Sequence, residues 1–176
     1  SYVGQNLDAP AETIRISTTI FGLHMMASTA NGTYYIDPYT KDLSNYIVYE
    51  KSKLKTTRVR QCLVEDTPES TEGLRMASES MLASDGKFRT YRMAMACTIE
   101  YAAFHISAAG LNAAAPLSLR KAAVLAAMNV TVARLNQVYE RDMSLTLQLV
   151  PNNDIIIFVT SDTFYNTDAT VLINQS

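Results

Sequence analysis

One stretch of the sequence, residues 91–160, most constrains the fold, because strand patterns flank a long helix pattern there. The helix is predicted from about Pro116 to Asp142, where apolar residues recur every three or four positions. The apolar stripe consists of Leu117, Val124, Leu125, Met128, Val132, Leu135 and Tyr139. The opposite face is predicted to be solvated and carries Arg120, Lys121, Asn129, Arg134, Gln137 and Glu140. A helix of this length spans roughly 38 Å at 1.5 Å per residue, and it needs a sheet to lie on.

Strands are predicted on both sides of this helix. Residues 90–97 and 145–149 alternate in hydropathy, whereas residues 155–159 are apolar throughout, as in a strand covered on both faces. The strand–helix–strand order predicts that the first two strands pair in parallel through a right-handed crossover. Residues 155–159 are expected to be an inner strand. Its apolar surface would then be covered by a second copy of the chain or by the remainder of a larger protein.

The first 55 residues have the pattern of a small antiparallel meander. Residues 13–17 alternate, residues 20–26 continue as a second apolar strand, and residues 33–36 and 46–49 are tyrosine-rich strands. Asn31-Gly32 predicts a type I′ hairpin, since both positions of that turn need positive φ. The tyrosines fit half-buried strand positions better than a ligand platform, because aromatic residues are favoured in strands.

The chain is therefore expected to divide into three parts. These are a β-rich domain (1–64), a linker (65–89) and an α/β unit (90–176), and the fold class is mixed α+β or α/β. The linker is polar and rich in turn-forming residues.

Exposed linkers are where proteolytic cuts fall. Arg75, Lys87 and Arg89 lie in or at the end of the linker and are the candidate processing sites. The alternative interpretation is a linker without a processing role.

Composition excludes several classes of function. The formal net charge is −2, with 48% hydrophobic and 18% charged residues. A sizeable core is therefore expected, without the basic surface typical of proteins that bind nucleic acid or anionic membranes. No apolar run approaches the roughly 20 residues of a membrane span. The N-terminal Ser1-Tyr2-Val3 has neither an initiator Met nor a signal peptide, and we interpret it as a processing boundary.

Motifs of self-contained active sites are absent from the sequence. There is no glycine-rich phosphate-binding loop and no Gly-x-Ser-x-Gly elbow. The two histidines, His24 and His105, lie too far apart in sequence to form a ready-made metal pair, and each is interpreted as a structural histidine. The residues alone thus predict no catalytic centre.

Extended phrases of the sequence nevertheless resemble a known family. They are residues 86–101 (GKFRTYRMAMACTIEY), 121–131 (KAAVLAAMNVT), 134–142 (RLNQVYERD) and 149–154 (LVPNND), with residues 35–39 (YIDPY) and 45–49 (NYIVY) upstream. The first four are similar to the opening of the catalytic domain of secreted bacterial reprolysin-like zinc metallopeptidases, which are metzincins. The last two are similar to the propeptide of that family.

The resemblance implies a propeptide followed by the first half of the upper catalytic subdomain, in a secreted or extracytoplasmic protein. The family's zinc-binding helix, His-Glu-x-x-His-x-x-Gly-x-x-His, does not occur in these residues. The chain ends before the place where the family carries that helix, so no zinc-ligand histidine and no general-base glutamate can be assigned. We expect the parent enzyme to use zinc to hydrolyse peptide bonds in peptide or protein substrates, and this chain alone to bind no zinc and to be inactive.

A second hypothesis, in which the protein is not an enzyme, stays open at this point. The chain would then be a non-catalytic β-rich binding or adhesion module with an α/β partner unit. An in-frame His-Glu-x-x-His shortly after Ser176 would favour the zymogen, and a stop codon there would favour the module.

The segment around Cys62 (RQCLVED, residues 60–66) is similar to the cysteine switch of metzincin propeptides. The resemblance implies that the Cys62 thiolate fills the fourth zinc position and keeps the catalytic water out. Leu63 stands where the family has Gly, and the basic residue lies two positions before the Cys instead of one. A Cys62–Cys97 disulfide and a free buried thiol are the two alternatives.

Overall fold

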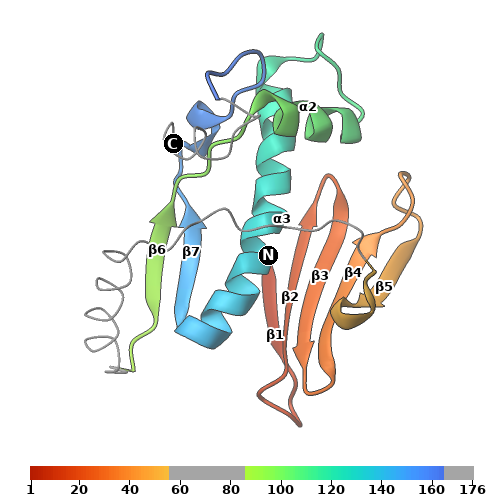
Figure 1. Cartoon of the computed structure of the whole chain (residues 1–176), viewed down its shortest axis with the longest axis vertical. Helices are drawn as coiled ribbons and strands as arrows, with labels where there is room; N and C mark the ends of the chain where they lie inside the picture. Colours follow the sequence, from red (N-terminus) through yellow and green to blue (C-terminus); the bar gives the residue numbers. More distant parts are fainter. Residues whose placement is uncertain (56–85, 165–176) are drawn as a thin grey trace. The chain divides into compact units, whose positions relative to one another are not determined.

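The computed structural model describes residues 1–55 and 86–164, and two separate sheets are present among them (Figure 1). The first sheet is an antiparallel meander in the order β1-β2-β3-β4-β5. Its strands are β1 (Tyr2–Gln5), β2 (Thr13–Thr19), β3 (Gly22–Thr29), β4 (Gly32–Pro38) and β5 (Tyr46–Glu50), and the 3-10 helix η1 (Lys51–Lys53) follows. The predicted N-terminal meander is thus confirmed.

The two tight turns of the meander have the same design. In each, a threonine hydroxyl accepts the N–H two residues later: Thr19 from Phe21 at 3.1 Å, and Thr29 from Asn31 at 3.2 Å. The glycine that follows, Gly22 or Gly32, has positive φ and starts the next strand. The predicted type I′ turn at Asn31-Gly32 is wrong in detail. Asn31 keeps negative φ, because the threonine supplies the turn's hydrogen bond.

The second sheet is formed by β6 (Arg89–Met93) and β7 (Leu145–Leu149), which pair in parallel as predicted. Between them the chain forms α2 (Ile99–Ala108) and α3 (Leu117–Met143). The predicted long helix is therefore confirmed to within a residue at each end. Ser144 ends α3 in the left-handed conformation, with φ of 53°, and leads directly into β7.

The expected inner strand at residues 155–159 is wrong. The chain instead forms the 3-10 helix η2 (Asn153–Ile156), followed by one isolated bridge between Ile157 and Cys97. Asn153 provides the physical reason. Its side chain accepts from Met95 N–H at 2.8 Å and donates to Met95 C=O at 3.0 Å. A side chain thus occupies the place of a strand partner, and the predicted strand over 90–97 ends at Met93.

Helix α3 is buried on two sides, which corrects the predicted solvated face. The main apolar core lies on one side and consists of Cys97, Ala102, Ile106, Val124, Met128 and Ile157. The other side packs against β2 and β3, and there Gln137 is only 3% exposed. Conversely, Leu117 of the predicted apolar stripe is 50% exposed, because it begins the helix beyond both contacts.

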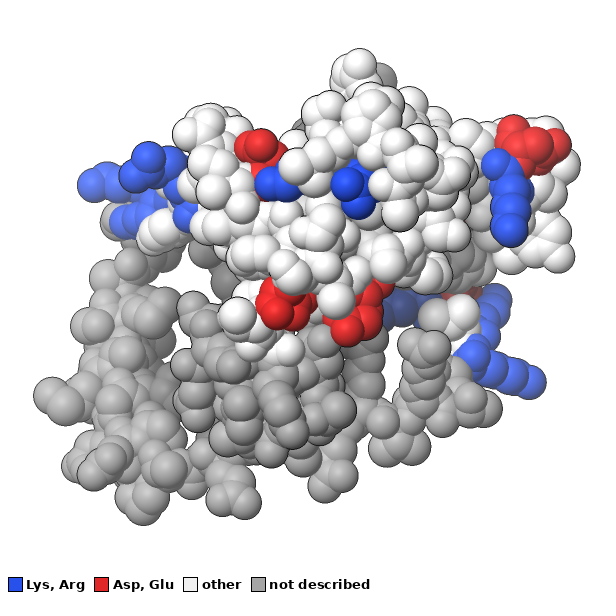
Figure 2. Space-filling model, turned by 90° about the horizontal axis from the view of Figure 1, so that it is seen from above, with Lys and Arg blue, Asp and Glu red and all other residues white. Residues whose placement is uncertain are grey.

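The fold class is mixed α+β, and residues 1–54 and 89–164 form one compact unit. No helix of the described residues has the length and hydropathy needed to cross a membrane. Figure 2 shows a broad uncharged area with Lys, Arg, Asp and Glu side chains in small separate groups. On that face, charge of one sign does not gather into a large patch of the kind that binds nucleic acid.

Candidate functional site: the polar contact between the meander and helix α3

Three polar residues of α3, namely Arg134, Gln137 and Glu140, form the contact with the meander. Their spacing of three places them on one side of the helix. Each reaches a different partner in the sheet, and these partners lie 97 to 125 positions away in sequence. We call this set of interactions the polar contact.

Gln137 is at the centre of the polar contact. Its side-chain amide donates to Thr13 C=O at 3.1 Å and to the Thr13 hydroxyl at 2.9 Å, and it lies 3.4 Å from the Ser28 hydroxyl. Thr13 begins β2 and Ser28 is near the end of β3. Because buried amides need partners, Gln137 fixes the position of α3 along both strands.

A buried ion pair joins Arg15 of β2 to Glu140 of α3. Arg15 is 7% exposed and Glu140 is 24% exposed. Removal of either partner would leave a charge with little water around it, which is costly.

Asp37 of β4 is the second charged centre, and it accepts three hydrogen bonds. His24 Nδ1 lies 2.7 Å from one carboxylate oxygen, the Tyr49 hydroxyl donates to the other at 2.6 Å, and Arg134 donates to the first. Since an ionised carboxylate only accepts, we assign the His24 proton to Nδ1. Arg134 also lies over the Tyr35 ring at 5.3 Å, and that ring stacks on Tyr49.

The surroundings of Asp37 determine how the cluster titrates. Burial by itself would raise the pKa of Asp37, but the hydrogen bonds from His24 and Tyr49 and the charge of Arg134 together lower it. Burial and the neighbouring Asp37 carboxylate raise the pKa of Tyr49 to about 12. Asp37 is therefore an anion held by three donors, and Tyr49 is a fixed donor. This suits a structural clamp better than acid–base catalysis.

The polar contact is incomplete. Arg15 Nε, His24 Nε2 and Arg134 Nε are buried without a hydrogen-bond partner among the described residues, and the three side chains line one narrow crevice between the sheet and α3. A buried polar group without a partner costs about 1–3 kcal/mol.

A second contact joins the β2–β3 turn to α2. The ring of Phe21 lies edge-on to His105 at 5.7 Å, and Tyr101 and Phe104 lie 4.4 and 5.1 Å from the same imidazole. Burial lowers the pKa of His105. Both histidines of the chain thus have structural surroundings, as expected, and both lie where the meander meets the helices.

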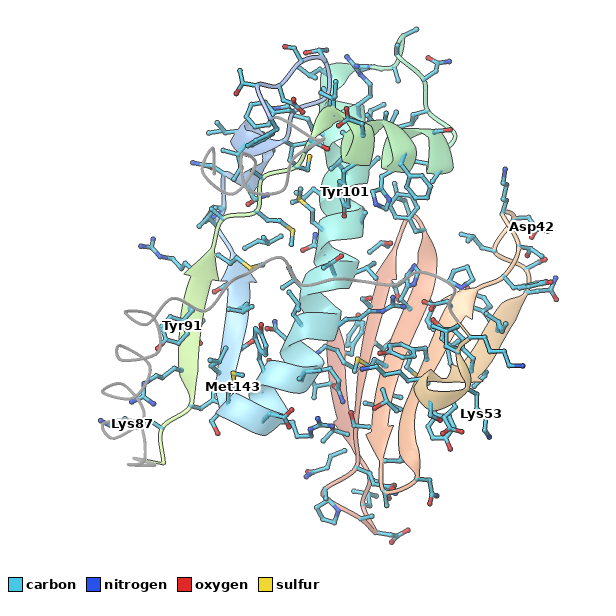
Figure 3. All side chains as sticks on the ribbon, in the orientation of Figure 1. Asp42, Lys53, Lys87, Tyr91, Tyr101 and Met143 are labelled. Atoms are coloured by element: carbon cyan, nitrogen blue, oxygen red, sulfur yellow. The ribbon has the colours of Figure 1, made fainter. Side chains whose placement is uncertain are left out.

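The residues predicted as sites from sequence lie elsewhere. Cys62 and Arg75 lie outside the described residues, so the proposed switch and that processing site stay predictions. Lys87 is exposed and just precedes β6 (Figure 3). Arg89 is the first residue of β6, and its N–H donates to Ser144 C=O at 3.0 Å. Cys97 is a free, buried thiol, and burial raises its pKa.

Within the described residues, no group of three or more His, Cys, Asp or Glu side chains is placed to hold a metal ion. Sequence reasoning missed the polar contact. The only sequence signal for it is the three-residue spacing of Arg134, Gln137 and Glu140, which is equally typical of a solvated face.

Comparison with known proteins found no family model, no curated protein and no solved structure that matches the chain.

Proposed function

We propose that this chain comprises the pro-region and the N-terminal part of the catalytic domain of a secreted, reprolysin-like zinc metalloendopeptidase zymogen. In this proposal the meander is the pro-region, and residues from about 90 onward begin the catalytic domain. The observation that carries the proposal is the chemical difference between the polar contact and the apolar core.

The apolar core is built entirely from residues 97–157. The meander adds Met26 to the buried apolar residues, and its Arg15, Ser28 and Asp37 form polar bonds with α3. Interfaces between units that separate are more polar than permanent ones. A pro-region must hold the catalytic domain and later leave it, and a polar, incompletely satisfied contact suits both requirements.

The proposed zinc would be held by residues of the parent enzyme and not by those described here. When bound, such a zinc ion activates a water molecule for peptide-bond hydrolysis. The contribution of this chain is to fold the first half of the domain and to present Cys62 as an inhibitory ligand.

The protein encoded by the complete reading frame provides the test of this function. We expect it to contain zinc and to hydrolyse peptides only after cleavage between residues 65 and 89, and we expect chelators to abolish the activity. The precursor with Cys62→Ser should be active before cleavage, whereas Cys97→Ser should stay silent and so serves as the matched control. A complete product without a His-Glu-x-x-His motif and without bound zinc would refute the proposal.

One observation favours the alternative, a binding or adhesion module. The edge strand β5 exposes Tyr46, Ile47 and Val48, and exposed edge strands can take up an extended peptide as an added strand. Under this alternative, a Val48→Pro substitution would abolish partner capture, and the complete product would lack peptidase activity.

A further inference from the structure

A cavity of about 350 Å³ opens between α3 and the segment that joins β6 to α2. It is lined by Met95, Ala96, Cys97, Thr98, Tyr101, Met128 and Thr131. Tyr101 lies on α2 where this helix approaches α3 (Figure 3). The volume is within the roughly 300–1,000 Å³ typical of small-molecule sites.

The lining residues differ in their exposure to solvent. Ala96 and Thr131 are exposed and form the mouth, while Cys97 is 8% exposed and Met128 only 1%. Cys97 and Met128 also belong to the apolar core. The cavity is therefore open to solvent and bounded on one side by residues of the apolar core.

Three interactions hold the wall of the cavity in place. The Asn153 side chain forms hydrogen bonds with both backbone groups of Met95. The backbone of Cys97 pairs with that of Ile157 in an isolated β-bridge, and the N–H of Ile99 donates to the Asp162 carboxylate at 2.7 Å. Asn153 is itself 1% exposed. The cavity is therefore pre-formed, which lowers the entropic cost of binding a ligand.

The chemistry of the lining defines the ligand. Among the residues that the structure describes, the lining contains no Lys, Arg, Asp, Glu or His, so an ionised ligand would lose its hydration without compensation from them. Met95 and Met128 supply flexible, polarisable surfaces. Tyr101 and Thr131 each supply a hydroxyl group to the lining, and these two hydroxyls are the polar pair of the cavity.

We propose that this cavity is a binding site for a small, neutral and mainly apolar molecule with one hydrogen-bonding group. The apolar part lies against Met95, Cys97 and Met128, and the polar group meets the Tyr101–Thr131 pair. Burial raises the pKa of the Cys97 thiol, which therefore stays protonated at neutral pH and reacts slowly. Binding is thus non-covalent. This inference does not depend on the proposed protease function.

The first test is a fluorescence titration of the full chain with the neutral probe N-phenyl-1-naphthylamine. We expect saturable binding at one site per chain. Thr131→Trp places an indole at the mouth and should weaken binding at least tenfold, whereas Asn129→Trp, exposed on the same helix outside the lining, should bind like the wild type. If Thr131→Trp does not fold, Ala96→Trp closes the mouth from the other side.

The second test uses Cys97 as a reporter in a Cys62→Ser background. N-ethylmaleimide should alkylate Cys97 slowly, and saturating probe should slow the reaction several-fold further. Absence of saturable binding, equal binding by the Thr131→Trp and Asn129→Trp variants, or an alkylation rate unaffected by the probe would each overturn the proposal.

Discussion

The side chain of Gln137 donates to both the carbonyl and the hydroxyl of Thr13, although 124 positions separate the two residues in sequence. This one amide connects the C-terminal third of the long helix to the first residue of β2. It is 3% exposed, and so water cannot replace its partners.

Gln137→Ala is expected to destabilise the fold by about 1–3 kcal/mol, because the part-buried carbonyl and hydroxyl of Thr13 lose their donor. Urea unfolding followed by circular dichroism measures this change. Asn129→Ala, exposed on the same helix, should change the free energy of unfolding by less than about 0.5 kcal/mol. Equal effects of the two substitutions would show that the polar contact contributes nothing to stability.

Much of the fold was predictable from the sequence, because its strongest patterns are local. The three- and four-residue spacing of Val124, Met128 and Val132 located α3, and alternation located β6 and β7. The run at residues 155–159 was misassigned, since a short apolar run does not distinguish a strand from a covered turn. The backbone conformation of this run depends on the hydrogen bonds between Asn153 and Met95, which are 58 positions apart in sequence.

The polar contact was not predictable for a related reason. Hydropathy assigns Gln137 and Arg134 to solvent, because it contains no information about distant partners. Asp37 directly precedes Pro38, and this pair of residues predicts only the end of a strand. Only the tertiary structure brings Asp37 and Arg134, 97 positions apart, into one ion pair.

Asn153→Ala should destabilise the fold by roughly 2 kcal/mol or more, because both backbone groups of Met95 lose their partner. It should also weaken probe binding in the cavity, since the Met95 wall is no longer fixed. Asn152→Ala is the matched control, because Asn152 is adjacent, chemically identical and exposed. Thermal unfolding and the fluorescence titration together test this prediction.

Asp37→Asn should remove a stabilising contribution that depends on pH. The pKa of Asp37 is lowered in the folded state from its usual 3.8, so its contribution is present above about pH 4 and is lost as the pH falls through the folded pKa. At neutral pH we expect a loss of about 1–2 kcal/mol, because Arg134 is partly exposed and solvent screens its charge. Asp8→Asn, exposed in the β1–β2 connection, should leave the acid limb of the stability curve unchanged.

Trypsin should distinguish Lys87 from Arg89. Lys87 is exposed before β6, whereas Arg89 lies within the parallel pairing with β7, and proteases cut extended, unpaired backbone first. Mass spectrometry of the first products should therefore show cuts after Arg75 or Lys87 and not after Arg89 or Arg92. Early cuts within α3 or the meander would contradict the domain division.

The fold should become less stable in mild acid because His105 takes up a proton more readily in the unfolded chain. Burial lowers its pKa below the usual 6.5, so the unfolded chain binds a proton more readily than the folded one. Stability is then complete above about pH 6.5 and decreases as the pH falls towards the folded pKa. His105→Phe keeps a ring against Phe21 and removes the titrating group, and it should flatten the stability curve between about pH 5 and 7. Urea midpoints across this range give the slope, and a slope identical to that of the wild type would assign the pH dependence to other groups.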